Sequence, residues 1–218
     1  MFCSALGLSD KAAALVGYDL GGAVAVGFAA RYPHFCKSLT LISPIGVVYR
    51  SGLNEKKLLP KYTGEFEMAR HRKTLALPEN QEVDFYNVAP DATHRYLVDK
   101  QISMVDWQIK NTPGYLGAIL SLVRNFPLRD MDELFSAVGR NSRKVLVVWG
   151  VHDKVCPYRH CTKVMEDAFP NAMMVDVLDA GHNAVMEKFE EVVTELLSFH
   201  REVFSDRQSL AVDPDADD

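Results

Sequence analysis

The chain has 218 residues, of which 48% are hydrophobic and 24% charged, a composition typical of a folded globular protein and not of a disordered chain. Its 24 Lys and Arg are outnumbered by 29 Asp and Glu, and it has no basic run, so nucleic acid is not expected as a partner. Four scattered cysteines do not make a disulfide scaffold, and the first residues lack the features of a signal peptide, so we expect a cytoplasmic location.

The first predicted elements form a strand–helix–strand unit. Residues 13–18 are an apolar run that predicts a strand, residues 22–32 have the spacing of a buried helix, and residues 38–43 predict a second strand. Strands that are apolar on both faces and joined by a helix indicate a parallel sheet. Residues 12–30 are long enough to suggest a membrane span, but Asp19 lies at their centre, so no stable span is expected.

The middle of the chain has a different texture and is predicted to be a helical insertion. Residues 47–143 are richer in charge and tyrosine, with helix-like segments at 91–109 and 114–124 and no strand comparable to those of the core. We therefore assign residues 1–46 to an α/β core and residues 47–143 to a helical cap.

The core pattern returns after residue 143. Strands are predicted at 144–149 and 173–178, and helices at 158–169 and 186–204. The fold class is thus α/β, with a parallel sheet of about four strands, a second core segment at 144–204 and a disordered acidic tail at 205–218.

Three polar residues follow three of the predicted strands directly: Asp19, Asp153 and His182. Ligands bind at the carboxyl ends of the strands of an open α/β sheet, so these side chains are candidates for one site. Two carboxylates and an imidazole make a hydrolytic set, in which one anion attacks, the imidazole activates water and the other anion orients the imidazole. Each residue also has a structural reading: a helix N-cap for Asp19, a turn for Asp153 and an unpartnered loop position for His182.

The residues around Asp19 indicate that it is the attacking group. Gly17, Asp19 and Gly21 fit the pattern Gly-x-nucleophile-x-Gly, a sharp strand-to-helix turn that exposes its middle residue. We expect a side chain at either glycine to clash with the turn. The backbone N–H of Leu20 is the candidate oxyanion donor, and the helix amino terminus would keep the carboxylate ionised.

A metal site was considered and is not predicted. Four possible zinc ligands lie within ten residues, namely His152, Cys156, His160 and Cys161, but their spacing fits no standard four-ligand pattern. We therefore expect neither a metal nor a cofactor, and a small molecule as the substrate.

Four segments in order resemble the α/β-hydrolase superfamily: VGYDLGG at 16–22, LTLISP at 39–44, WGVHDKVCP at 149–157 and DAGHNAVMEKFEEV at 179–192. The resemblance covers the core from about residue 10 to residue 204 and implies the triad Asp19, Asp153 and His182 with a cap at 47–143. Within this superfamily most members have serine at the elbow. Aspartate there resembles the epoxide hydrolases and haloalkane dehalogenases, whose substrates are small or lipophilic.

The cap suggests a different substrate class. Residues 114–128 resemble the cap of serine-type esterases and carbon–carbon bond hydrolases, so cap and elbow disagree. Two cap tyrosines serve as hydrogen-bond donors in epoxide hydrolases, and the candidates for that role in this chain are Tyr62, Tyr86, Tyr96 and Tyr115.

The resemblance also implies strands that this chain does not contain. Only 18 residues precede Asp19, where a family member has further strands and the loop that gives a second oxyanion donor. The first strand would then be an exposed apolar edge, so either the chain is incomplete, which we favour, or this edge pairs with a partner. The alternatives to an active Asp-type hydrolase are a non-catalytic binding module and an esterase-like or C–C hydrolase-like lineage with an altered nucleophile.

Overall fold

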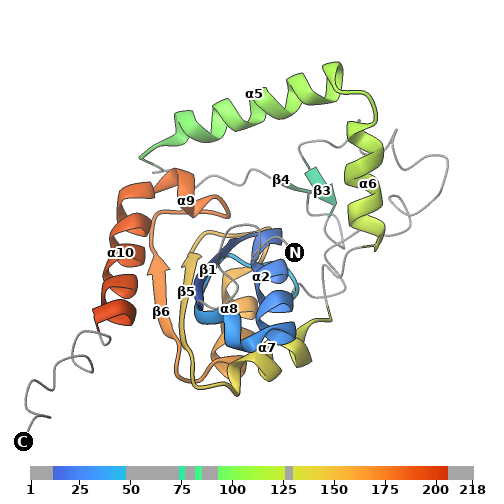
Figure 1. Cartoon of the computed structure of the whole chain (residues 1–218). Helices are drawn as coiled ribbons and strands as arrows, with labels where there is room; N and C mark the ends of the chain where they lie inside the picture. The colour runs from blue at the N-terminus through green and yellow to red at the C-terminus, as the bar shows by residue number, and fades with distance from the viewer. Residues whose placement is uncertain (1–11, 48–73, 77–81, 85–92, 126–129, 206–218) are drawn as a thin grey trace, which may run out of the picture.

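The computed structural model describes residues 12–47, 74–76, 82–84, 93–125 and 130–205. Its centre is a four-stranded sheet in the order β1-β2-β5-β6, with all strands parallel (Figure 1). The strands are β1 (Ala13–Tyr18), β2 (Cys36–Ile42), β5 (Lys144–Gly150) and β6 (Met173–Val177). The predicted α/β class and the four-stranded parallel sheet are confirmed.

The two inner strands are buried on both faces, as their continuous apolar sequences require. Leu39 and Leu41 of β2 are fully buried, and every residue of β5 from Val145 onward is buried. Strand β1 is one of the two outer strands of the described sheet, with β6 at the other edge, and its Val16 is 53% exposed. The prediction of an apolar, exposed edge at this strand therefore agrees with the described part of the structure.

Helices cover both faces of the sheet. On one face lie α2 (Leu20–Arg31), α7 (Asp132–Gly139) and α8 (Tyr158–Ala168), and on the other lies α10 (Phe189–Ser205) (Figure 1). A short 3₁₀ turn, Pro33–Phe35, joins α2 to β2. Phe135 of α7 is fully buried in the core on the first face, and Phe199 of α10 lies in the core on the second. Burial of one such side chain contributes about 1.5–3 kcal/mol to the stability of the fold.

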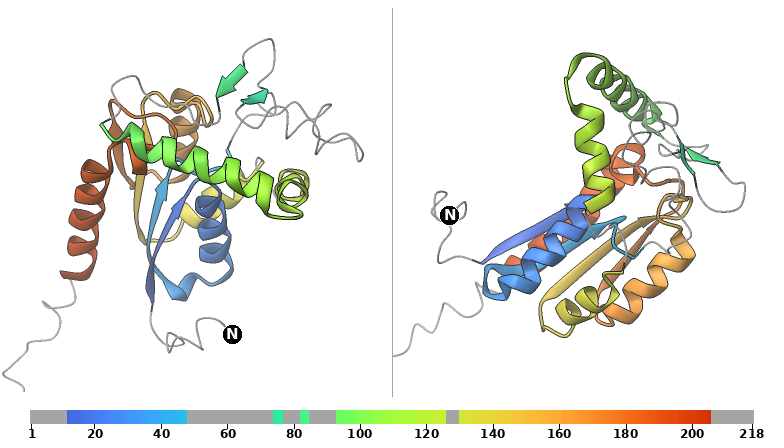
Figure 2. Two further views of the ribbon diagram at one scale, coloured as in Figure 1. Left: turned by 90° about the horizontal axis from the view of Figure 1, so that it is seen from above. Right: turned by 90° about the vertical axis from the view of Figure 1, so that its right-hand side faces the viewer.

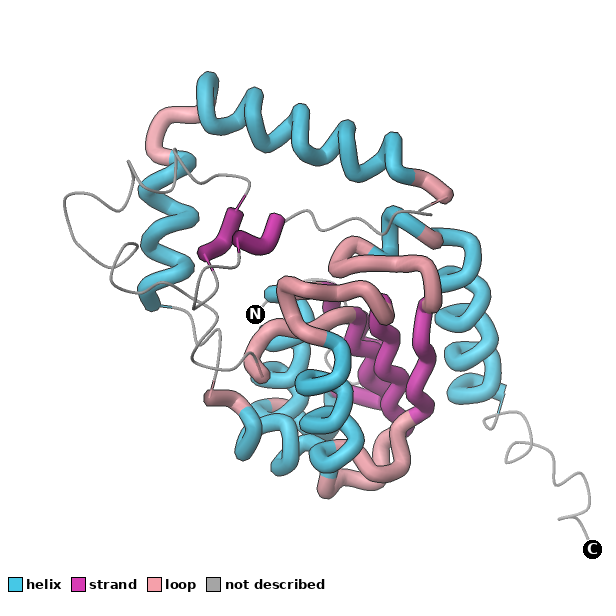
Figure 3. The backbone as a smooth tube through the Cα atoms, turned by 180° about the vertical axis from the view of Figure 1, so that it is seen from behind, coloured by secondary structure: helices cyan, strands magenta, loops and turns pink. Residues whose placement is uncertain are grey.

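Between β2 and α7 the structure describes α5 (Arg95–Asn111), α6 (Tyr115–Asn125) and a small antiparallel pair, β3 (Thr74–Ala76) and β4 (Glu82–Asp84), which together we call the cap. These elements lie beyond the carboxyl ends of the sheet strands, and α5 crosses over that edge when seen from above (Figures 2 and 3). Besides its helices, the described part of 47–143 contains the β3–β4 pair, each strand of which has only three residues.

Two boundaries differ from the sequence prediction. Helix α7 falls within the range 47–143, yet it packs against α2 and α8 of the core. The helix predicted at 186–204 is two helices, α9 (Ala184–Glu187) and α10, separated at Lys188, where φ is −139° and ψ is 51°. Apolar periodicity does not show this break, because it continues across Lys188.

The segment 12–30 forms a strand, a turn and a helix instead of a membrane span. Among the described residues, no helix has both the length and the apolar character needed to cross a bilayer. The tail from residue 206 onward, Tyr62 and Tyr86 lie outside the described residues.

Candidate active site

Asp19 occupies a sharp turn between β1 and α2. Its φ of 51° and ψ of −121° are unusual for a residue other than glycine and cost about 1–3 kcal/mol. The turn is held by backbone hydrogen bonds, from Asp19 N–H to Ile42 O at 3.0 Å and from the N–H groups of Gly22 and Ile45 to Asp19 O at 3.0 and 3.1 Å. The carboxylate makes no capping hydrogen bond to the helix, so the N-cap alternative does not account for this residue.

The glycines of the elbow have different roles. A Cβ at Gly17 would lie 2.4 Å from Gly21 O, so the expected clash at this position is confirmed. The same expectation for Gly21 is wrong, because no described atom would lie within 4 Å of a Cβ there. The close approach occurs one residue later, where a Cβ on Gly22 would lie 2.6 Å from Pro44 Cβ. Pro44, two residues after the end of β2, thus packs directly on the first turn of α2.

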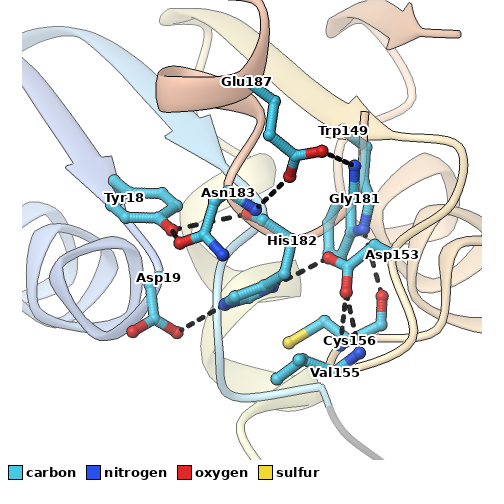
Figure 4. Close-up of polar contacts among 10 residues, drawn as sticks. All are labelled: Tyr18, Asp19, Trp149, Asp153, Val155, Cys156, Gly181, His182, Asn183 and Glu187. Atoms are coloured by element: carbon cyan, nitrogen blue, oxygen red, sulfur yellow. Dashed lines mark hydrogen bonds and ion pairs between the residues drawn. The ribbon is translucent and has the colours of Figure 1, made fainter. Parts of the chain in front are cut away.

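The three predicted polar side chains meet at the carboxyl end of the sheet. His182 Nε2 lies 3.2 Å from Asp19 Oδ1, and His182 Nδ1 lies 2.9 Å from Asp153 Oδ2 (Figure 4). The side chains of His182 and Asp153 are 2% and 0% exposed, whereas that of Asp19 is 25% exposed. The imidazole therefore bridges a solvent-accessible carboxylate and a buried one, an arrangement we call the triad.

The loop after β5 fixes the buried carboxylate. Asp153 Oδ1 accepts hydrogen bonds from the N–H groups of Val155 and Cys156, both at 2.9 Å. Trp149 donates its Nε1–H to Cys156 O at 3.1 Å, which anchors the same loop to the strand. Asp153 therefore has both of the roles considered for it, the turn residue and the orienting acid. One oxygen organises the turn and the other pairs with His182.

The two carboxylates determine the charge state of His182. Burial of the imidazole lowers its pKa, but the charge and hydrogen bond of Asp153, followed by those of Asp19, raise it, and the net pKa is about 10 instead of 6.5. At neutral pH the ring is therefore an imidazolium that donates Nδ1–H to one carboxylate and Nε2–H to the other.

Three residues that the sequence analysis missed hold the histidine loop. The buried carboxylate of Glu187 accepts hydrogen bonds from the N–H groups of Gly181 and Asn183, which flank His182 (Figure 4). The phenol of Tyr18 donates to Asn183 Oδ1 at 2.8 Å, which ties the loop to the end of β1. Burial raises the pKa of Tyr18, and the nearby carboxylates raise it further, so it remains a donor.

The sequence contained only weak signals for these residues. Glu187 lies within an amphipathic helical pattern, in which a glutamate is normally expected on the solvent-facing side. Tyr18 fits the pattern as the last residue of an apolar strand. Asn183 is next to the histidine, but its partner is 165 residues away in the chain.

The remaining site predictions are placed as follows. Leu20 is the first residue of α2, and the oxyanion role of its N–H stays a prediction. Of the described cap tyrosines, Tyr96 is 54% exposed on α5 and Tyr115 begins α6. Their proposed role as hydrogen-bond donors to a substrate stays a prediction.

The four possible zinc ligands do not gather in the described structure. His152 and His160 are exposed, whereas Cys156 and Cys161 are buried, so the two pairs face different environments. Burial, with nearby negative charge, also raises the pKa of both thiols, which keeps them protonated in the metal-free protein.

One other grouping brings possible metal ligands together. Ligand atoms of Asp153, Cys156 and His182 lie within 4.8 Å of one another. Both oxygens of Asp153 and the facing nitrogen of His182 already have hydrogen-bond partners, which account for this proximity without an ion.

Comparison with known proteins shows the family of the chain. The model of a family described as the alpha/beta hydrolase fold matches residues 2–189. The chain belongs to this family. Monoacylglycerol lipase abhd6-A of Xenopus laevis is 25% identical over 204 residues, which are 90% of this chain and 58% of that protein. The acetyltransferase component of an acetoin-cleaving system from Cupriavidus necator is 28% identical over 180 residues, covering 82% of this chain and 43% of its own length.

Solved structures show the same fold. A thermophilic esterase from Thermogutta terrifontis matches with a TM-score of 0.66 and 23% identity, over 93% of this chain and 69% of its own. A meta-cleavage product hydrolase from Pseudomonas fluorescens matches with a TM-score of 0.62 and 18% identity, over 92% and 68%. This α/β-hydrolase family member therefore spans only part of the length of the proteins it resembles.

Proposed function

We propose that this α/β-hydrolase family member hydrolyses a small or lipophilic molecule through nucleophilic attack by the Asp19 carboxylate on an sp³ carbon. The observation that carries the proposal is a carboxylate at the elbow turn, one quarter exposed, whose Oδ1 lies 3.2 Å from Nε2 of a buried histidine. Such an arrangement suits epoxides and alkyl halides, because each offers a carbon whose leaving group departs when a carboxylate attacks.

In the first step an oxygen of Asp19 bonds to the substrate carbon. The carbon–halogen or epoxide carbon–oxygen bond breaks, and its electron pair leaves with the halide or stays on the ring oxygen. An alkoxide formed in this way takes a proton, for which the Nε2–H of His182 is the positioned donor; where a halide leaves, that proton passes to solvent. The product of the step is a neutral alkyl ester on Asp19.

Formation of the ester prepares His182 for the second step. The negative charge that faced Nε2 has disappeared, so the pKa of the imidazole falls and the neutral ring becomes available as a base. It then takes a proton from water, the resulting hydroxide attacks Cγ of Asp19, and the alcohol leaves. The hydrogen bond from His182 to Asp153 stabilises the imidazolium that forms again.

A second candidate function is binding without catalysis. The relatives include proteins named as monoacylglycerol lipases, yet attack by Asp19 on a carboxylic ester would give an anhydride instead of a stable acyl-enzyme. The ion pair between Asp19 and His182 also favours this candidate, because it neutralises the nucleophile in the resting state. These features would also be expected of an esterase-like or C–C hydrolase-like lineage in which the nucleophile has changed to aspartate. Such a protein would retain the cap but would no longer catalyse the original reaction.

Covalent trapping tests the first candidate against the second. The variant His182→Gln is incubated with an aryl epoxide and, separately, with a bromoalkane, and the intact mass and the peptide containing Asp19 are measured. We expect the mass of the added alkyl group on Asp19 with the bromoalkane, because bromide leaves without a proton and the ester then lacks the base for its hydrolysis. With the epoxide we expect slower labelling, because the alkoxide must take its proton from solvent.

Two variants serve as controls. His160→Gln alters an exposed histidine and should not accumulate the ester, and the double variant Asp19→Asn, His182→Gln should remain unlabelled. Absence of label from His182→Gln with both probe classes would contradict the nucleophilic role and favour a binding function.

A further inference from the structure

Glu187 has an unusual position for a glutamate. Its side chain is fully buried, although a carboxylate is rarely buried unless it is paired. Oε2 accepts the N–H of Gly181 at 3.0 Å, and Oε1 accepts the N–H of Asn183 at 3.2 Å. These are the residues immediately before and after His182, so both oxygens of one carboxylate hold the backbone that carries the imidazole (Figure 4).

The backbone of Glu187 contacts the cap. Its carbonyl oxygen accepts the N–H of His94 at 3.2 Å, at the residue that precedes α5. The His94 ring in turn lies 2.6 Å from Glu190 Oε2, which reinforces the junction between α5 and the start of α10. Glu187 thus lies between the cap and the histidine loop and contacts both.

We propose that Glu187 is a positioning residue, which sets the place of the His182 imidazole by holding the two peptide groups beside it. This inference rests on the proposed function, in which His182 is the base. The two oxygens of one buried side chain hold the N–H groups on both sides of His182, which leaves the loop little freedom to turn. The loop is confined on its other side as well, since a Cβ on Gly150 would lie 2.1 Å from Gly181 O.

The test replaces one oxygen of this carboxylate. In Glu187→Gln one of the two amides must face an NH₂ group, which cannot accept its hydrogen bond, so the loop shifts and the contact between His182 and Asp153 loosens. The pH titration of the imidazole is followed by NMR with ¹³C-labelled histidine, which requires no substrate. We expect the midpoint of His182 to fall by about one pH unit or more.

The matched control is Glu191→Gln, which makes the same substitution at an exposed glutamate of α10. Its His182 midpoint should equal that of the wild type. A Glu187→Gln variant with a lower Tm but an unchanged His182 midpoint would overturn the proposal, because the glutamate would then contribute to folding alone.

A measurement on the unaltered chain decides the question if Glu187→Gln does not fold. Amide hydrogen exchange should be slow at both Gly181 and Asn183, and fast exchange at either one would overturn the proposal. Neither measurement depends on turnover. Failure of this inference is therefore separable from failure of the Asp19 nucleophile, which the trapping experiment measures.

Discussion

The ion pair between Asp19 and His182 gives a quantitative prediction for the variant Asp19→Asn. Removal of the negative charge 3.2 Å from Nε2 should lower the pKa of His182, because the imidazolium loses one of its two carboxylate partners. Asp153 remains in place, so the pKa should stay above its ordinary value of 6.5.

The size of the effect follows from Coulomb's law. At 3.2 Å, two unit charges interact by about 1 kcal/mol at the dielectric constant of water and by about 5 kcal/mol at an effective constant of 20. These energies correspond to about one to four pH units. The Asp19 side chain is 25% exposed, so solvent screens the pair and we expect the lower half of this range, about one to two units.

The assay is an NMR titration of the His182 imidazole in wild type and variant. Asp179→Asn is the matched control, since Asp179 is 54% exposed, lies three residues before His182 and contacts Lys188 instead. We expect the midpoint to fall in Asp19→Asn and to stay near 10 in Asp179→Asn. Identical midpoints in Asp19→Asn and wild type would refute the reasoning that the elbow carboxylate governs the charge of the histidine.

Two further predictions concern stability. The folded pKa of His182, about 10, exceeds its unfolded value of 6.5, so the stabilisation from its protonation is complete below pH 6.5 and is lost as the pH rises toward 10. Urea unfolding between pH 6.5 and 8, below the range in which ionisation of the unfolded thiols contributes, should show a decline of up to about 1.4 kcal/mol per pH unit that is absent from His182→Gln. Gly17→Ala should lower the free energy of unfolding by about 1–3 kcal/mol because its Cβ meets Gly21 O, whereas Gly21→Ala should change it little; equal effects in urea unfolding would count against the elbow geometry.

The elbow motif illustrates how far local pattern reaches. Gly17 and Asp19 predict a strand-to-helix turn, and the turn is present. Glycine permits it because a side chain at residue 17 would collide with the backbone at the start of the helix. The same pattern predicts that a side chain at Gly21 would clash, but the close contact occurs at Gly22 instead. The difference arises because Pro44, the residue that approaches the helix, lies in the loop after β2, on the far side of α2 in the chain.

The sequence by itself determined the parallel α/β core and the ends of its strands, because buried strands and sharp turns are encoded within a few neighbouring residues. The positions of Asp19, Asp153 and His182 directly after those strands were enough to name them as candidates for one site. The tertiary structure decided how those three groups touch, that α7 packs in the core, and that Glu187 and Tyr18 hold the histidine loop. Contacts of this kind join residues that can be more than 160 positions apart. They depend on the order of strands in the sheet and on the packing of helices against it, neither of which any local pattern contains.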